Sequence, residues 1–170
     1  ATLVPDPPAA LTSNKGWELD ESNEWLRDTI GRLHDSEIRV SLFIDPYQDA
    51  VRRAKDLGAD RVELYTGPYA HAFDSPECTP ILGQHREASR LARSIGIGVN
   101  AGHDLNLRNL PTYVKNVAGL LEVSIGHALI CDALYLGLKR TVGLYIKAIG
   151  AQPATNVGRA ATPSKRKRAQ

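Results

Sequence analysis

Polar and apolar positions along this chain change repeatedly between a two-residue and a helical periodicity, which predicts strands that alternate with helices. Short apolar or β-branched runs predict strands at 1–4, 38–44, 61–65, 97–101 and 120–125. Apolar residues at helical spacing predict helices within 20–33, 50–57, 88–95 and 107–117, and a long helical region with 134, 138, 142, 145 and 149 on one face. The stretch 68–83 is predicted to be a long loop.

About five β-α units in succession require parallel strands with right-handed crossovers. Two architectures satisfy this pattern, a doubly wound open sheet and a closed (βα)8 barrel. Polar residues just past the carboxyl end of each strand favour the barrel. A whole barrel takes roughly 250 residues, so we expect residues 1–150 to form an incomplete TIM-barrel domain, with three units preceding Ala1. Residues 151–170 are predicted to be a disordered basic tail, because Pro, Ala, Thr, Ser, Lys and Arg dominate there.

Composition narrows the class of protein. An apolar content of 42% and a charged content of 24% are ordinary for a soluble globular protein. The net charge is only +2 and the basic excess lies in the run 165–168, which argues against nucleic acid as a partner. Two cysteines without paired spacing indicate a reducing compartment and neither a disulfide scaffold nor a zinc site. With no membrane-length apolar run and no secretory signal, the sequence predicts a cytoplasmic protein.

Two Gly-His pairs end consecutive predicted strands, Gly102-His103 and Gly126-His127. Glycine at a strand end lets backbone N–H groups approach a ligand closely, and histidine is the side chain best suited to move protons near neutral pH. Two such pairs predict one shared site at the carboxyl edge of the sheet. The alternative for each histidine is a core-edge residue that hydrogen-bonds to backbone.

A carboxylate lies inside an apolar strand, where Glu63 stands between Val62 and Leu64. Alternation places its side chain on the opposite face from its neighbours. Burial of a carboxylate is costly unless the group is paired or hydrogen-bonded. Glu63 is therefore a candidate functional residue, and the alternative is a structural ion pair, for example with Arg61.

Four positions that follow predicted strands are further candidates. Gly126 opens a helix, whose free N–H groups form a ready site for an anion. Asp45 and Asp104 are predicted to cap the helices that follow them. Thr12 lies in the loop after the first strand, where it can hold a substrate hydroxyl or phosphate unless the loop is simply solvated.

Four motifs occur in an order and at a spacing typical of one known family. They are Val40–Asp45, Glu63–Ala70, Val99–His103 and Ile125–Ala128. Together they resemble the pyridoxine 5'-phosphate synthase family over residues 1–149. The resemblance implies a (βα)8 barrel assembled as a homo-octamer, which condenses 3-amino-2-oxopropyl phosphate with 1-deoxy-D-xylulose 5-phosphate in vitamin B6 biosynthesis. The products are pyridoxine 5'-phosphate, inorganic phosphate and water, and no metal or organic cofactor is implied.

Matched motif by motif, the resemblance also assigns roles. His103 corresponds to the family's proton donor and Glu63 to its transition-state-stabilising carboxylate. Gly126 and His127 correspond to the pair that binds the aminooxopropyl phosphate. These four residues are the core of the predicted site.

Two more substrate contacts follow from the same resemblance. Thr12 falls at the family's contact to the deoxyxylulose phosphate. Asp104 stands where some members have a ligand-binding glycine, so a backbone contact to substrate is expected there. The family's first three strands carry further catalytic and phosphate-binding groups, so we expect these 170 residues alone to be inactive.

Two alternatives to an active synthase stay open. The first is a non-catalytic remnant that binds a phosphate ligand or a partner barrel. The second is an unrelated phosphate-binding barrel enzyme. A Schiff-base aldolase needs a lysine at a strand end, and no predicted strand offers one.

Overall fold

Five parallel strands form one sheet in the order β1-β2-β3-β4-β5. The computed structural model describes residues 1–150. The strands are Thr2–Leu3 (β1), Ser41–Ile44 (β2), Arg61–Tyr65 (β3), Gly98–Gly102 (β4) and Leu120–Ser124 (β5). A doubly wound sheet reverses its strand order at a switch point, whereas this order is sequential, as in the wall of a barrel. The predicted incomplete barrel is confirmed as an open five-stranded sheet, and the predicted tail at 151–170 lies outside the described residues.

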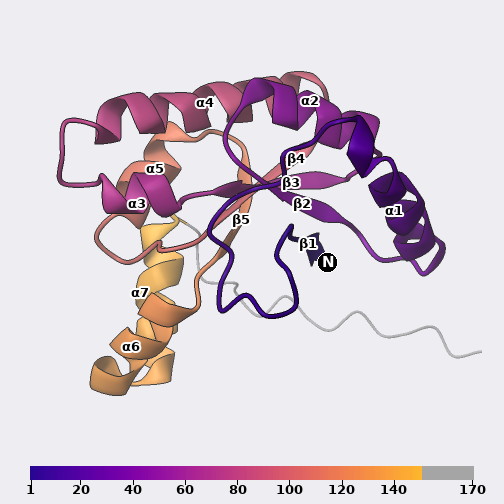
Figure 1. Ribbon diagram of the computed structural model, residues 1–170. Helices are drawn as coiled ribbons and strands as arrows, with labels where there is room; N and C mark the ends of the chain where they lie inside the picture. Colours follow the sequence, from indigo (N-terminus) through magenta and orange to yellow (C-terminus); the bar gives the residue numbers. More distant parts are fainter. Residues whose placement is uncertain (151–170) are drawn as a thin grey trace, which may run out of the picture.

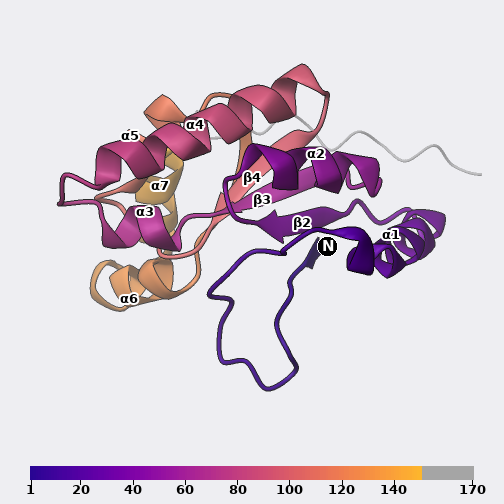
Figure 2. The same cartoon turned by 45° about the horizontal axis from the view of Figure 1, so that its top comes forward.

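The helices alternate with the strands and lie largely on one side of the sheet (Figure 1). They are η1 (Glu21–Asn23), α1 (Trp25–Asp35), α2 (Gln48–Asp56), α3 (Gly67–His71), α4 (Cys78–Ser94), α5 (Leu110–Asn116), α6 (His127–Leu136) and α7 (Leu138–Ala148). Figure 2 shows α2 and α4 above the strands, while the loop at 4–20 extends from the other side. This arrangement leaves the inner face of the sheet for polar residues.

The main core lies between the sheet and helices α1, α2 and α4. Val62 and Leu64 of β3 are fully buried in it, and Glu63 between them points to the inner face, as the alternation predicted. The same face of β4 carries Gly98 and Gly102, which lie opposite Arg61 and Tyr65 in register. These glycines leave room for the longer side chains of β3.

A second cluster joins α3, α4 and α5. Tyr69 and Tyr113 are fully buried there, with ring centroids 5.1 Å apart. His85 of α4 is also fully buried, and its Nδ1 is hydrogen-bonded to the Tyr113 hydroxyl at 2.9 Å. Residues from the stretch 68–83, which was predicted to be a loop, therefore pack into this cluster.

Predictions of local structure at 68–83, in the long helical region and at Asp45 are wrong. The stretch 68–83 is not a loop, because Pro68 lies in the first turn of α3, where its missing N–H costs nothing, and α4 begins at Cys78. The long helical region is two helices, separated at Gly137, whose φ of 79° is left-handed. Asp45 caps no helix, because α2 begins at Gln48 with Tyr47 at its N-cap position.

The last strand and the helices after it are much more exposed than their apolar sequence predicts. Leu121 is 56% exposed, Leu134 80% and Tyr135 90%. No residue of α6 is buried. Among residues 1–150, no helix combines the length and the apolar character needed to cross a membrane.

Candidate functional site

A cleft of 950 Å³ opens where the carboxyl ends of the strands meet. Its lining includes all six residues that were predicted for the site from the sequence: Thr12, Glu63, His103, Asp104, Gly126 and His127. These residues come from the loop at 4–20, β3, the end of β4 and the start of α6. The structure therefore brings all six together.

His103 follows directly after β4 and is held by contacts on three sides. Its Nε2 lies 3.1 Å from the Thr12 hydroxyl, and its Nδ1 lies 2.8 Å from a carboxylate oxygen of Asp104. The Tyr65 ring and the imidazole form an edge-to-face pair with centroids 5.1 Å apart. The side chain is 21% exposed, so the ring is fixed in place yet open to the cleft.

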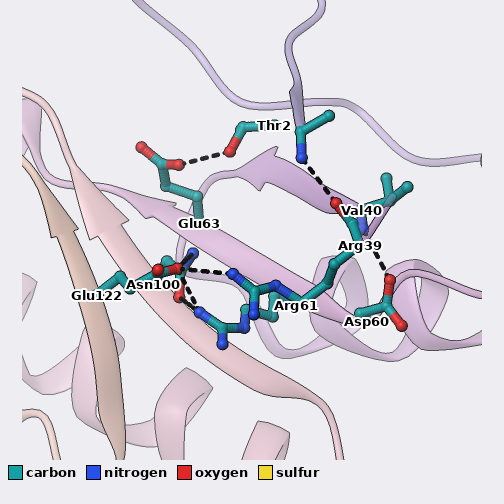
Figure 3. A network of polar contacts seen from close by, with 9 residues as sticks. Thr2, Arg39, Val40, Asp60, Arg61, Glu63, Asn100 and Glu122 are labelled. Atoms are coloured by element: carbon teal, nitrogen blue, oxygen red, sulfur yellow. Dashed lines mark hydrogen bonds and ion pairs between the residues drawn. The ribbon is translucent and has the colours of Figure 1, made fainter. Parts of the chain in front are cut away.

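Glu63 is 7% exposed and lies deeper in the same cleft. The Thr2 hydroxyl donates to its Oε2 at 2.9 Å (Figure 3). A Cβ at Gly102 would collide with Oε1, so the carboxylate rests against a strand position that only glycine leaves open. Of the two interpretations of Glu63, an ion pair with Arg61 is wrong, because Arg61 instead contacts Glu122 and Asn100.

Arg61 and its partners form a separate polar group on the inner face, nearer the amino ends of the strands (Figure 3). Glu122 accepts from Arg61, from Asn100 Nδ2 at 3.0 Å and from Arg39 at 3.5 Å. The two arginines thus have a carboxylate between them. This group supports the inner face and does not reach the cleft residues named above.

Gly126 and His127 mark the start of α6. Gly126 is the N-cap residue, and no side chain caps the helix there. The first N–H groups of a helix have no partner within it, and the residues at this end, Gly126, His127 and Ala128, line the cleft. The helix dipole adds positive potential at this end, so the geometry suits a phosphate group.

Asp104 does not cap the next helix, which corrects one of the two interpretations of this residue. Helix α5 begins at Leu110 with Asn109 at its N-cap position. The Asp104 carboxylate turns back to His103 instead, while its carbonyl accepts from Asn109 Nδ2 at 3.2 Å. The side chain of Asp104 is 61% exposed at the mouth of the cleft.

Sequence reasoning missed several residues of the site. Thr66 is fully buried, and its hydroxyl lies 2.6 Å from the Gly102 carbonyl and also contacts the His103 carbonyl. His71, Ser124 and Thr2 line the cleft as well. Thr2 had a usable signal, since alternation within the first strand places it on the inner face. Thr66 had none, because its partners lie 36 and 37 residues further along the chain.

The arrangement combines groups for proton transfer with a place for anions. Burial, and to a smaller extent the charges of Asp104 and Asp45, raises the pKa of Tyr65, which keeps its phenol protonated near neutral pH. In residues 1–150, no group of three or more His, Cys, Asp or Glu side chains is placed to hold a metal ion. The described side chains offer groups for proton transfer beside a helix N-terminus that suits an anion.

Comparisons with known proteins give the family. The family model for "Pyridoxal phosphate biosynthesis protein PdxJ" matches residues 1–151. A "Pyridoxine 5'-phosphate synthase" of Cytophaga hutchinsonii is 50% identical over 148 residues, which are 87% of this chain and 62% of that protein. A protein of the same name from Chelativorans sp. is 48% identical over 153 residues, again 62% of its length. The chain thus spans about 62% of the curated relatives it matches.

Solved structures resemble the chain more distantly. The HMG-CoA lyase of Brucella melitensis aligns with 71% of this chain and 46% of its own, at 17% identity and a TM-score of 0.47.

Proposed function

Because this chain belongs to the family of the pyridoxal phosphate biosynthesis protein PdxJ, we propose that it is the major part of a pyridoxine 5'-phosphate synthase. The whole protein condenses 3-amino-2-oxopropyl phosphate with 1-deoxy-D-xylulose 5-phosphate and releases inorganic phosphate and water. The observation that carries this proposal is the cleft that brings His103, His127 and Glu63 together with an open helix N-terminus. Condensation, dehydration and loss of phosphate all require proton transfer beside an anion site.

In this proposal, His103 is the proton donor. Its ring stands at the carboxyl end of β4, 21% exposed, so a substrate oxygen in the cleft can reach Nε2. A leaving hydroxyl or phosphate oxygen takes up a proton as its bond to carbon breaks, and Nε2 is the atom placed to supply it. Thr12, 3.1 Å away, lies beside the same nitrogen and contacts the deoxyxylulose phosphate.

Glu63 has a different task, because it lies deeper and has little contact with water. A buried carboxylate stabilises positive charge that develops on a nearby substrate atom, such as the amino nitrogen as it adds to a carbonyl. The hydrogen bond from the Thr2 hydroxyl orients the carboxylate, and the absence of a side chain at Gly102 leaves the space that the carboxylate occupies. A fixed dipole or charge needs no reorganisation at the moment of reaction.

The phosphate of the aminooxopropyl substrate binds at the start of α6. Gly126 brings the backbone close to the anion, and His127 lines the same part of the cleft. Asp104 contributes to substrate binding through its backbone. The protein needs no cofactor, works in the cytoplasm and assembles as a homo-octamer.

The chain spans 62% of its relatives' length, so the test uses a hybrid as well as the chain itself. In the hybrid, the segment of this chain that matches the Cytophaga hutchinsonii relative replaces the corresponding 148 residues of that protein. We expect the hybrid to convert the two substrates to pyridoxine 5'-phosphate and inorganic phosphate in equal amounts, measured by chromatography and by a phosphate assay. We expect the 170-residue chain alone to bind 3-amino-2-oxopropyl phosphate in a calorimetric titration without turnover.

The control is the same hybrid with His103→Asn. Product from the unmodified hybrid and almost none from this variant supports the assignment of the site. A hybrid that binds phosphate but forms no product contradicts the proposal and favours a non-catalytic phosphate-binding protein.

A further inference from the structure

The side chain of Asp104 has a partner that a substrate-binding role through its backbone does not explain. Its Oδ2 lies 2.8 Å from Nδ1 of His103, the residue directly before it. On the other side of the same ring, Nε2 lies 3.1 Å from the Thr12 hydroxyl. Carboxylate, imidazole and hydroxyl therefore form one continuous row across the mouth of the cleft.

The backbone that produces this row is strained. His103 has a φ of 93° and Asp104 a φ of 57°, two successive non-glycine residues in left-handed conformations. Such conformations are unfavourable for most L-residues, and Asp is among the few that tolerate them. Strain of this kind persists only where the surroundings enforce it, and it is concentrated at functional sites.

Contacts on both sides hold this turn in place. The buried Thr66 donates its N–H to the Gly102 carbonyl at 2.9 Å, and its hydroxyl reaches the carbonyls of Gly102 and His103. On the other side, Asn109 Nδ2 donates to the Asp104 carbonyl. The direction in which the His103 ring leaves the backbone is thus fixed by the fold.

We propose that Asp104 is a positioning residue that accepts the Nδ1 proton of His103 and so directs Nε2 toward Thr12 and the substrate. A histidine with its Nδ1–H held by an acceptor carries the lone pair on Nε2 when the ring is neutral. Nε2 is then the nitrogen that gains and loses protons during turnover. The proposal rests on the proposed role of His103 in proton transfer, but the arrangement of the ring can be tested without it.

An alternative is that Asp104 and His103 form an ordinary exposed pair. Asp104 is 61% exposed, and such pairs contribute little to stability. An ordinary pair leaves the ring free to turn and its tautomer unaffected by loss of the carboxylate. The two possibilities therefore differ in what happens to the ring when the carboxylate is removed.

The test observes the ring nitrogens of His103 by long-range ¹H–¹⁵N NMR in the 170-residue chain without substrate. His103 signals are assigned by their loss in His103→Gln. Asp104→Gly removes the carboxylate and is compatible with the φ of 57°. Asp104→Asn keeps an acceptor oxygen in the same place and also tolerates this backbone.

We expect wild type to show the tautomer with the proton on Nδ1, Asp104→Gly to lose that preference, and Asp104→Asn to lie between them. His34, whose Nε2 lies 2.8 Å from Asp60, is the internal control, and its ring signals should stay unchanged in every variant. In the active hybrid, Asp104→Gly should lower kcat about tenfold with little change in KM. This loss is smaller than that for a buried orienting carboxylate, because Asp104 is exposed.

An unchanged tautomer in Asp104→Gly overturns the proposal, and so does a variant in which only KM rises. If the hybrid has no activity but the ring responds as expected, the proposed function fails while the positioning of His103 by Asp104 stands. The two failures are thus distinguishable.

Discussion

His103 and His85 lie in contrasting parts of the molecule, one at the mouth of the cleft and the other inside the helical layer. The side chain of His103 is 21% exposed, and partners lie at both ring nitrogens. His85 is fully buried, with Tyr113 at Nδ1 and no hydrogen-bond partner at Nε2 in the described part of the chain. Burial lowers the pKa of His85 to about 4, so this ring is neutral at pH 7.

The difference shows that the surroundings of a histidine determine whether its ring supports packing or is available for proton transfer. At His85, the apolar surroundings keep the ring uncharged and its packing supports α3, α4 and α5. At His103, polar partners orient the ring while solvent and substrate can still reach it. Substitutions in the cleft should therefore affect turnover and binding, whereas changes in the helical layer should affect folding.

The largest expected effect is on turnover. We expect His103→Asn to lower kcat of the active hybrid by about 10²–10⁴-fold, the usual contribution of general acid–base catalysis. Thermal unfolding should change little, because the ring is partly exposed. Single-turnover kinetics should show the loss in a chemical step, and a normal kcat with a raised KM would make His103 a binding residue instead.

The second prediction concerns acid and His85. The folded pKa of about 4 lies below the ordinary value of 6.5, so between these two values the unfolded chain binds a proton that the folded chain does not. Stability from this residue is complete above pH 6.5 and falls as the pH is lowered toward 4. Between pH 7 and pH 5 the expected loss is about 2 kcal/mol.

Urea unfolding at the two pH values measures this loss, and His85→Gln is the matched variant that cannot titrate. Wild type should lose about 2 kcal/mol more than the variant on going from pH 7 to pH 5. The same pH dependence in both proteins would mean that His85 is protonated equally easily in the folded and unfolded states.

A third, smaller effect is expected at the phosphate site. Gly126→Val should weaken binding of 3-amino-2-oxopropyl phosphate about tenfold, since a side chain there keeps the anion from the helix N-terminus, whose dipole contributes up to about 2 kcal/mol. The fold should persist, because Gly126 has a φ of −104° and a Cβ there meets no atom within 4 Å.

The control is Gly143→Val in α7, where a Cβ also meets no atom within 4 Å and which does not line the cleft. Calorimetric titration should show weaker binding for the variant at Gly126 alone, with unchanged circular dichroism for both. Equal affinity in the two variants would place the phosphate elsewhere.

The smallest effect is expected at a third histidine, which lies on the surface. His34 pairs with Asp60 at 2.8 Å, and both side chains are 39% exposed. Solvent screens such a pair, so His34→Gln should change the free energy of unfolding by less than about 1 kcal/mol at pH 7. A loss above about 2 kcal/mol in urea unfolding would show that exposure is a poor guide to the importance of a histidine here.

Much of this fold follows from local pattern. The alternation of Val62, Glu63 and Leu64 placed the glutamate on the inner face, because successive side chains of a strand point to opposite sides. The end of β4 at Gly102 and the start of α6 at Gly126, just after β5, were visible in sequence, and parallel strands bring their carboxyl ends to one edge. The meeting of the two Gly-His pairs in one cleft was therefore predictable from the sequence.

Other features depend on contacts between distant segments, and only the tertiary structure decided them. Thr66 holds the turn at His103 across 37 residues, and Thr12 reaches the same ring across 91. Asp104 follows a strand and was expected to cap a helix, but the left-handed turn directs its carboxylate to His103 instead. Periodicity specifies which face a side chain occupies, whereas its partner on that face depends on how the strands and loops pack.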